Sequence, residues 1–421
     1  MEIAKKLLKE RYICNLKEEP RLFIGIELEY PIVHIEGLAT DCEVSRQLMR
    51  ELMHILEFKA VNYDDEGNPI SISNSIGDCI LFEVSYNTLE FAFAKATTIQ
   101  EIELRLAEYL SVIQSFLRQY KHELQAKGIN PCWKKNDNRP VKTSRYQMLS
   151  HFLHSSEEYP ASHSFPDYGA FICGNQAQFD VSRTRFLRVL NVFNKIEPVK
   201  AYLFANSELT EVLPNYRISR DFFWEKSMHG YFNKNIGVYQ EEFTTENDFL
   251  DYMLGTAMFS VMRDGEYCYF NPNTVEEYFS TELVTGYTAN ETHDIVCIVP
   301  QKEDIQYHRS YHYQELTTRG TIEFRSICTQ PWERTFTPIA FHLGLLVNLE
   351  YFESIVATSN LYTRFGNDYD VLRKQFSKKE LTQEEAELIK ELSKELLECA
   401  YQGLKMRGYG EESYLYEILV D

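Results

Sequence analysis

The chain has 421 residues, of which 44% are hydrophobic and 25% are charged, a composition typical of a folded protein with a large core. It carries 43 lysines and arginines against 63 aspartates and glutamates, so its net charge is −20. Nonspecific binding to nucleic acid or to an anionic membrane requires basic surface, and this balance argues against both. For an anionic substrate such as a nucleotide to bind, metal ions and local arginines would have to reverse the negative electrostatic potential of the protein.

The N-terminal residues and the cysteines predict a cytoplasmic protein. Residues 1–12 have the pattern of a short charged helix, without the apolar core of an export signal. The longest apolar stretch, residues 336–349, is interrupted by His342 and Asn348, so no membrane-spanning segment is expected. Nine cysteines occur without a C-x-x-C pair and their number is odd, which favours reduced thiols over a disulfide framework or a zinc site.

Residues 23–30, FIGIELEY, alternate like a β-strand with one apolar and one acidic face. Glu27 and Glu29 share the acidic face and would lie about 6.6 Å apart, at a rise of roughly 3.3 Å per residue. Two carboxylates at that distance repel each other unless a cation or an arginine lies among them. The alternative is a half-exposed strand whose acidic face is simply solvated.

The next two segments are predicted to be a helix and a pair of strands. Residues 45–58 place apolar side chains at helical spacing, which indicates packing. Residues 80–94 are rich in β-formers and carry Glu83 and Glu90, which would face opposite ways on one unbroken strand. Both can serve one site only if the chain turns between them, and the Ser-Tyr-Asn-Thr sequence at residues 85–88 supplies a candidate turn.

A long amphipathic helix is predicted over residues 99–127, with Gly128 as its C-cap. Residues 145–148 predict a short helical segment. Residues 174–181 alternate like a second polar-faced strand, on which three side chains share the polar face: Gln176, Gln178 and Asp180. Two helices follow, at residues 184–204 with an interruption near Pro198, and at residues 246–262. A turn and strand are predicted at residues 264–273.

Residues 311–327 contain a predicted strand pair that breaks near Gly320. Carboxylates and arginines alternate along one of its faces: Glu315, Arg319, Glu323 and Arg325. A metal-nucleotide site needs this interleaving, because carboxylates hold magnesium while arginines pair with phosphate or carboxylate oxygens. A self-neutralising ladder of surface salt bridges is the alternative interpretation. Further on, Thr382 and Glu385 form a capping box that begins a helix over about residues 383–406.

Eight segments, in order along nearly the whole chain, resemble those of the glutamate-cysteine ligases, also called γ-glutamylcysteine synthetases, and are most similar to the plant-type group shared with many bacteria. Each segment is weak by itself, whereas their order and spacing together are specific. The segments are GIELE at 25–29, FEVSYNTLEF at 82–91, RYQML at 145–149, NQAQFDV at 175–181, LFANS at 203–207, ISRDFFW at 218–224, IEFRSICTQPW at 322–332 and GLKMRGY at 403–409.

The resemblance implies an α+β fold of the glutamine-synthetase type, with a curved, mainly antiparallel sheet whose concave face holds the site and with helices outside. It implies a single catalytic ligase domain over residues 1–421, whose C-terminal part, from about residue 376, is helical. It also implies a reaction: the γ-carboxylate of L-glutamate attacks the γ-phosphate of ATP, and the amine of L-cysteine then attacks the γ-glutamyl phosphate. The implied metal is Mg²⁺, which phosphoryl transfer needs for charge neutralisation.

The resemblance assigns a role to each candidate residue. Arg319 and Arg325 would steady the phosphate oxygens and the charge that develops on transfer. Arg220 would clamp the α-carboxylate of glutamate, with Trp224 beside the substrate. Five carboxylates would hold the magnesium: Glu27, Glu29, Glu90, Glu315 and Glu323.

Three assignments are less direct. Glu83 would accept the proton that the incoming amine loses, and it is also a candidate metal ligand. Gln178 would orient substrate or metal. Asp180 either does the same or merely supports the sheet.

The chain departs from the family between Glu83 and Glu90. The plant-type group has the glycine-rich pattern E-P-G-G-Q-x-E there, whereas this segment is one residue longer and has no glycine. The acceptor amine could therefore differ from cysteine while the ATP chemistry is retained. Two alternatives stay open beside glutamate-cysteine ligase: a related ligase that joins glutamate or another carboxylate to a different amine, and a noncatalytic nucleotide-binding relative.

Overall fold

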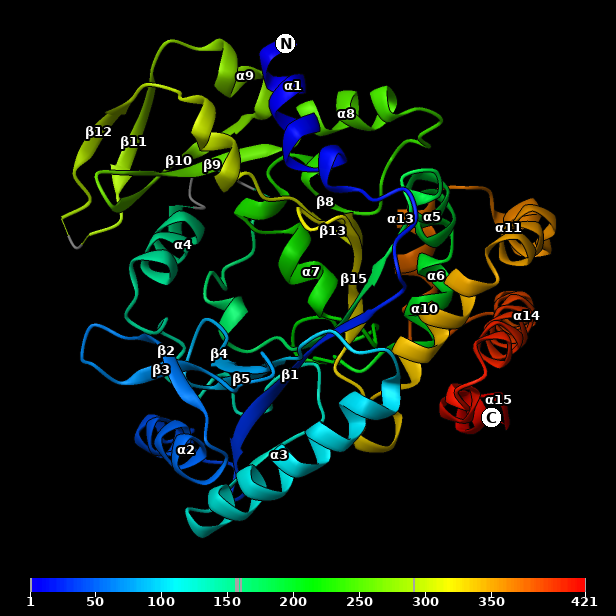
Figure 1. The fold of residues 1–421 in the computed structure, drawn as a ribbon, viewed down its shortest axis with the longest axis horizontal. Helices are drawn as coiled ribbons and strands as arrows, with labels where there is room; N and C mark the ends of the chain where they lie inside the picture. The colour runs from blue at the N-terminus through cyan, green and yellow to red at the C-terminus, as the bar shows by residue number, and fades with distance from the viewer. Residues whose placement is uncertain (1, 156–158, 160, 291, 421) are drawn as a thin grey trace.

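The computed structural model describes residues 2–155, 159, 161–290 and 292–420. Its centre is a sheet with the strand order β14-β15-β7-β1-β5-β4-β3-β2, and β6 also pairs with β1 (Figure 1). Every pairing in this sheet is antiparallel, which confirms the predicted sheet type. The strands are β1 Ile24–His34, β2 Lys59–Tyr63, β3 Pro69–Ser73, β4 Cys79–Phe82, β5 Thr88–Ala92, β6 His122–Leu124, β7 Gly174–Asp180, β14 Gln314–Leu316 and β15 Thr321–Cys328.

The central strand β1 shows why the sheet forms. Its apolar residues Ile24, Ile26 and Leu28 are at most 1% exposed and pack into the core, as the alternation predicts. Strands β7 and β5 pair with its two edges, so Glu27 lies opposite Gln176 on β7 and opposite Ala92 on β5. The other face of the sheet therefore carries polar side chains on neighbouring strands.

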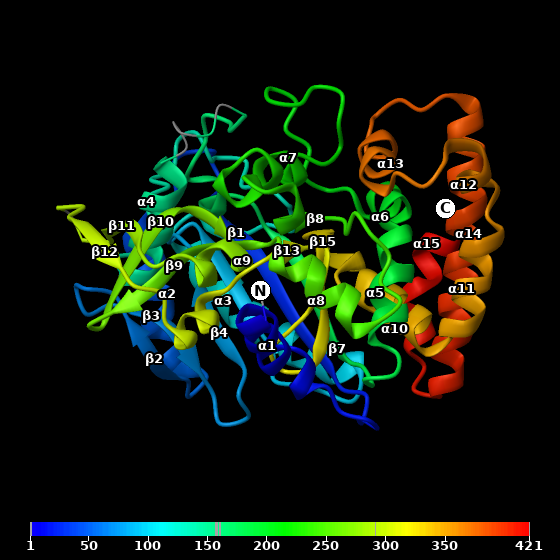
Figure 2. The same ribbon diagram turned by 90° about the horizontal axis from the view of Figure 1, so that it is seen from above.

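Helices cover the sheet and confirm the expected α+β class. The helices α2 Cys42–Ile55 and α3 Ile99–Gln119 pack beside the N-terminal strands, at the bottom of Figure 1. The C-terminal helices gather on one side of the molecule in Figure 2. The helices α5 Phe186–Lys195 and α6 Glu197–Phe204 pack against them. The C-terminal helices are α10 Thr337–Val347, α11 Leu349–Thr358, α12 Asn360–Phe365, α13 Tyr369–Phe376, α14 Gln383–Arg407 and α15 Tyr416–Val420.

A second, four-stranded sheet lies beside the first, with the order β12-β11-β10-β9 (Figure 1). Helix α4, Ser144–His154, packs against β10. The other elements of this region are α1 Glu2–Arg11, α7 Arg220–Glu225, β8 Ile236–Gly237, α8 Glu246–Leu254, β9 Ala257–Arg263, β10 Glu266–Thr274, α9 Val275–Ser280, β11 Val284–Thr288, β12 Ile295–Ile298 and β13 Tyr311–His312.

Two helix predictions are wrong about where the helix ends. The helix predicted over residues 99–127 ends at Gln119, because Lys121 adopts φ +59° and the next residues pair with β1 as β6. The helix predicted over residues 246–262 ends at Leu254, and the segment after it pairs with β10 as β9. In both cases pairing with a distant strand overrides a local helical pattern.

Other boundaries follow the sequence closely. Helix α2 begins at Cys42, three residues earlier than predicted, because the carboxylate of Asp41 caps it by accepting from the Glu43 amide. The expected interruption near Pro198 separates α5 from α6. The capping box of Thr382 and Glu385 begins α14.

The structure also bears on the membrane and disulfide expectations. Within the described residues no single helix is long and apolar enough to cross a bilayer, although two helical stretches bent by 95°, residues 332–347 and 349–365, reach that length and composition together. All nine cysteines are free thiols.

The contact between α10 and α14 leads to a stability prediction. A Cβ at Gly403 would lie 2.0 Å from the Gly344 carbonyl oxygen, so the two backbones pass too closely for any side chain. We expect Gly403→Ala to lower the free energy of unfolding by about 1–3 kcal/mol through overpacking, despite the better helix propensity of alanine. Chemical denaturation measures this, with the exposed Glu398→Ala on the same helix as control; equal stability of Gly403→Ala and wild type would contradict the close packing.

Candidate active site

A cavity of about 580 Å³ opens between the polar face of the main sheet, α4, α7 and β9. All six carboxylates that the sequence singles out line it, from β1, the β4–β5 turn, β5, β14 and β15: Glu27, Glu29, Glu83, Glu90, Glu315 and Glu323. The turn predicted between Glu83 and Glu90 brings both of them to this cavity. It also forces Val84 into a positive φ of 58°.

The strand register places like charges directly opposite each other. Glu29 on β1 faces Glu90 on β5, and Glu315 on β14 faces Glu323 on β15. Opposed like charges destabilise a sheet, and each of these four residues is only 8% exposed. Packing alone gives no reason for such an arrangement, so it indicates a site for a positively charged or proton-bearing partner.

Glutamine amides separate and hold several of the carboxylates. The Nε2 group of Gln178 donates to Glu27 and to Glu323, both at 3.0 Å, and its Oε1 accepts from Arg319 at 2.5 Å. Gln176 donates to Glu29 at 3.0 Å. Gln178 is thus placed behind the cavity wall, where it positions the carboxylates.

Arg325 is the main positive charge on this face of the sheet. It forms ion pairs with Glu323 and, at 3.3 Å, with Glu315. Burial opposes its charge, but the carboxylates of Glu323 and Glu315 outweigh burial and raise the pKa of Arg325. Arg325 therefore stays charged, and its ion pairs engage two of the expected metal ligands, Glu315 and Glu323.

For Glu27, Glu29 and Glu90, nearby positive charge does not outweigh burial. Burial, and next the charge of Glu323, raise the pKa of Glu27 to about 8, although Arg325 and Arg319 oppose the rise. Burial also raises the pKa of Glu29, and burial with Glu83 raises that of Glu90 well above its usual range. The site therefore buries more carboxyl groups than its arginines compensate, and the raised pKa of these groups favours their protonated form in the protein without metal.

The donor set of the cavity has the chemistry of a magnesium site. Carboxylate oxygens are the ligands that Mg²⁺ prefers, and Glu27, Glu29 and Glu90 have no cationic hydrogen-bond partner among the residues that the structure describes. Glu315 and Glu323, which were also expected to bind metal, are paired with Arg325 and would have to leave it. Within the described ranges no three acidic, histidine or cysteine side chains converge closely enough to hold a metal ion as they stand. The donor chemistry fits a hard divalent cation, whose binding would need the side chains to draw together.

Helix α7 supplies the substrate-facing candidates Arg220 and Trp224, which both line the cavity. The Nη1 group of Arg220 donates to the Ile327 carbonyl at 2.9 Å. A Cβ at Gly174 would lie 2.7 Å from Arg220 Nη2 and 3.4 Å from Glu29 Oε2, so this glycine lets the guanidinium lie beside the sheet. The Nε atom of Arg220 has no hydrogen-bond partner in the described part of the chain, which leaves donor capacity for a ligand.

A buried ionic cluster fixes α7 from behind. Arg373 on α13 donates to Asp221 through Nε at 2.7 Å and Nη2 at 3.0 Å, and to Glu197 at 2.7 Å. Lys200 donates to the same Glu197 at 2.6 Å. The two cations balance the two carboxylates, so the cluster is neutral and holds Asp221, and with it the neighbouring Arg220, in place.

Asp180 does not line the cavity. It ends β7, where its carboxylate accepts from the Phe23 amide at 3.2 Å and lies 3.8 Å from Lys17. Of the two interpretations given for Asp180, these contacts fit the one in which it supports the sheet.

Sequence reasoning missed several residues of the cavity. Arg145 and Arg309 line it without a carboxylate partner in the described ranges. Arg145 belongs to the RYQML segment, which could have drawn attention to it, whereas Arg309 lies in a connection before β13 that has no sequence signal. Tyr146 donates from its hydroxyl to Glu83 at 3.0 Å.

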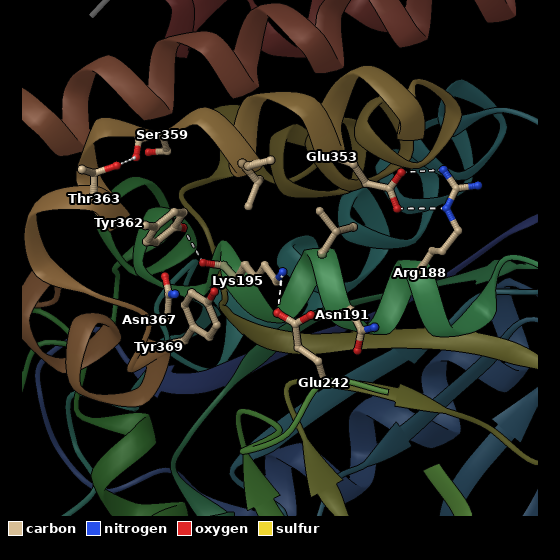
Figure 3. Close-up of a pocket in the computed structure, with 13 residues that line it drawn as sticks. Arg188, Asn191, Lys195, Glu242, Glu353, Ser359, Tyr362, Thr363, Asn367 and Tyr369 are labelled. Atoms are coloured by element: carbon tan, nitrogen blue, oxygen red, sulfur yellow. Dashed lines mark hydrogen bonds and ion pairs between the residues drawn. The ribbon is translucent and has the colours of Figure 1, made fainter. Parts of the chain in front are cut away.

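A second cavity, of about 570 Å³, lies between α5, α11 and α12 (Figure 3). Its cationic side chains are already paired: Lys195 with Glu242 at 2.5 Å, and Arg188 with Glu353 at 2.5 Å. The Tyr362 hydroxyl donates to the Lys195 carbonyl. Glu353 on α11 and Tyr362 on α12 thus tie the C-terminal helices to α5, while Glu242 ties α5 to the segment before α8. The contrast with the uncompensated acidic cavity identifies the latter as the candidate active site.

The fold and site define a class of protein: mixed α and β structure, with an antiparallel sheet that presents an acidic cavity edged by arginines. The sequence profile of Glutamate-cysteine ligase family 2 (GCS2) matches residues 23–417. The chain belongs to this family.

Individual relatives are distant. The chain is 24% identical over 295 residues to the chloroplastic glutamate–cysteine ligase of Brassica juncea, covering 68% of this chain and 53% of that protein. It is 23% identical over 294 residues to chloroplastic glutamate–cysteine ligase A of Oryza sativa subsp. indica, covering 69% and 56%. The chain thus spans about half the length of the curated relatives that it matches.

Two solved structures are similar at 9% identity. One is a bifunctional glutathione synthetase from Pasteurella multocida, with a TM-score of 0.37 over 99% of this chain and 53% of that chain. The other is a glutamate–cysteine ligase from Francisella tularensis in complex with AMP, with a TM-score of 0.31 over 95% and 98%.

The raised pKa of Glu27 leads to a pH prediction for the protein without metal. Between pH 4.5 and about 8 the folded protein keeps a proton that the unfolded chain has lost, so this group lowers stability as pH rises through that window. Glu27→Gln removes the effect. We expect the stability of Glu27→Gln relative to wild type to grow by about 1.4 kcal/mol per pH unit across the window.

Denaturation in EDTA at several pH values between 4.5 and 8 measures this difference. The exposed Glu391→Gln is the matched control and should show no pH-dependent difference from wild type. A difference for Glu27→Gln that does not change with pH would show that Glu27 is ionised and compensated in the folded protein.

Proposed function

We propose that this protein is an ATP-dependent carboxylate–amine ligase that forms γ-glutamylcysteine from L-glutamate and L-cysteine through γ-glutamyl phosphate, with Mg²⁺. The observation that carries the proposal is that all six glutamates and all three arginines that the sequence singles out gather around one cavity in a member of the GCS2 family; the arginines are Arg220, Arg319 and Arg325. The nine free thiols support a reducing, cytoplasmic location.

The reaction has two steps. A γ-carboxylate oxygen of glutamate attacks the γ-phosphorus of ATP, the bond from that phosphorus to the bridging oxygen breaks, and ADP leaves. The amine nitrogen of the acceptor then attacks the acyl carbon. A C–N bond forms, the C–O bond to phosphate breaks, phosphate leaves, and the nitrogen loses a proton.

The arginines bind and orient the anionic groups. Arg319 and Arg325 are assigned to phosphate oxygens, where fixed positive charge stabilises the transferring group. Arg220 is assigned to the glutamate α-carboxylate, because its free Nε and the adjacent Nη2 offer two parallel donors. Trp224, one helical turn further on α7, forms the wall beside it.

Glu27, Glu29 and Glu90 would hold the divalent cation. When bound, the cation would neutralise phosphate charge and draw the carboxylates together. Glu83 is assigned as the acceptor of the amine proton, and the hydroxyl of Tyr146, at 3.0 Å, fixes its orientation.

A second candidate is ligation of glutamate to a different amine. The turn between Glu83 and Glu90 favours it, since it lacks the two glycines of the plant-type group. Val84 in this turn lines the cavity next to Gly169. The two candidates share the first step and differ only in the acceptor.

The direct test is phosphate release by the purified protein with ATP, Mg²⁺ and L-glutamate, with and without L-cysteine, followed by mass spectrometry of the product. We expect release to require both amino acids and to yield γ-glutamylcysteine. Release that requires glutamate but ignores cysteine would select the second candidate. If no amine in a broad panel gives phosphate release, the protein has no ligase activity.

Arg220 can be tested separately. Arg220→Lys keeps the charge but loses the second donor, and losing one charge-assisted hydrogen bond costs about 1.5–3 kcal/mol, so we expect the KM for L-glutamate to rise about 10–100-fold. The KM for ATP should change little. Steady-state kinetics measures both constants, with Arg217→Lys as control because Arg217 lies outside the cavity and bonds the Phe376 carbonyl. A selective rise in the KM for ATP would reassign Arg220 to the nucleotide.

A further inference from the structure

Three neighbouring rings line the cavity on the side away from the main sheet. Trp224 on α7 and Tyr311 on β13 have ring centroids 5.0 Å apart, and His229, in the 3₁₀ turn Met228–Gly230, lies 5.2 Å from Trp224 and 4.3 Å from Tyr311. All three line the cavity. We call these three residues the ring wall.

An aliphatic surface also lines this part of the cavity. Met148, Leu149 and Leu153 on α4 line it, together with Ile172. Apolar lining binds apolar ligand surface, at roughly 25 cal/mol per Å² removed from water. The CH₂–SH side chain of cysteine has only two heavy atoms and would cover little of this surface.

Arg145 lies where this apolar part meets the acidic floor. Its guanidinium carbon lies 5.6 Å from the centroid of the Tyr146 ring, and the hydroxyl of Tyr146 donates to Glu83 at 3.0 Å. Although burial opposes its charge, Tyr146 and Glu83 raise the pKa of Arg145. It has no carboxylate partner in the described ranges, and a substrate carboxylate would be a natural bidentate one. An amino acid held there would place its amine near Glu83, the assigned proton acceptor.

His229 adds to the ring wall a buried ring nitrogen that has no hydrogen-bond partner among the described residues. Its side chain is buried, with 3% exposure, and its Nδ1 lies 2.7 Å from the Tyr168 hydroxyl. Its Nε2 has no partner among the described residues. Burial lowers the pKa of His229 to about 3, so the ring is neutral at physiological pH. A buried polar atom without a partner is costly, and a polar substituent on a ligand ring would satisfy it.

We propose that the acceptor subsite takes an aromatic α-amino acid as well as cysteine, and with the higher kcat/KM. The aromatic side chain lies between the ring wall and the aliphatic surface of α4, while Arg145 binds the carboxylate. This inference rests on the γ-glutamyl phosphate chemistry proposed above. The amine attacks the same acyl carbon, phosphate leaves, and Glu83 takes the proton, so no further co-reactant is needed.

The test measures phosphate release by the full chain with ATP, Mg²⁺ and saturating L-glutamate. The acceptors are L-phenylalanine, L-tyrosine, L-cysteine and phenethylamine, and mass spectrometry identifies each product. We expect kcat/KM for phenylalanine or tyrosine to exceed that for cysteine at least tenfold. Phenethylamine should be at least tenfold worse than phenylalanine, because it lacks the carboxylate for Arg145. A higher kcat/KM for cysteine than for both aromatic amino acids would overturn the inference.

Hydroxylamine separates this inference from the proposed function, because it traps an acyl phosphate as a hydroxamate whatever the acceptor subsite prefers. Formation of γ-glutamyl hydroxamate without use of aromatic acceptors would overturn the inference and leave the ligase function standing. Absence of both hydroxamate and phosphate release would overturn both.

Two variants locate the subsite. Leu149→Trp fills the space that faces the ring wall, and we expect it to lower the ratio of kcat/KM for phenylalanine over cysteine at least tenfold. Arg145→Met should raise the KM for phenylalanine at least tenfold and abolish the advantage of phenylalanine over phenethylamine.

Leu104→Trp, on the exposed face of α3, is the matched control and should change neither the acceptor preference nor the KM for phenylalanine. A rise in the KM for ATP, with acceptor preference unchanged, would assign the ring wall to the nucleotide and overturn the inference.

Discussion

The structure depends on the repulsion among buried carboxylates on one face of a single sheet. Antiparallel register sets Glu29 against Glu90 and Glu315 against Glu323, with little water to screen them. A fold selected for stability alone would replace these side chains. Their presence supports the proposed function, in which a cation and charged substrates supply the missing compensation and the protein gives up stability in the unliganded state for affinity in the liganded one.

The rest of the architecture makes this repulsion tolerable. The opposite face of β1 is apolar and almost fully buried, so it anchors the strand that carries Glu27 and Glu29. Glutamine amides on β7 hold the carboxylates at fixed positions, and α7 is braced by the neutral cluster around Arg373. Rigid support of this kind keeps charged groups in a productive geometry before the substrate arrives.

The cavity combines two chemistries that different elements supply. The main sheet provides the acidic floor and Arg325, which suit phosphoryl transfer. The ring wall and α4 come from segments outside that sheet, and they shape the space beside Glu83. Under the proposed function, the acceptor can therefore change during evolution through α4, the ring wall and the β4–β5 turn, while the sheet assigned to carboxylate activation stays the same.

The sequence by itself determined the polar-faced strands, because side chains on a strand alternate with a fixed period of two. It also determined the turn between Glu83 and Glu90 and the capping box of α14, since these depend on neighbouring residues. The tertiary structure alone decided that β6 and β9 are strands, because their pairing with distant strands outweighs a local helical pattern. It likewise decided that Arg309 and His229 reach the cavity and that Asp180 does not. The distance of a residue from a site depends on how separate elements pack together, and the spacing of residues along the sequence does not contain this information.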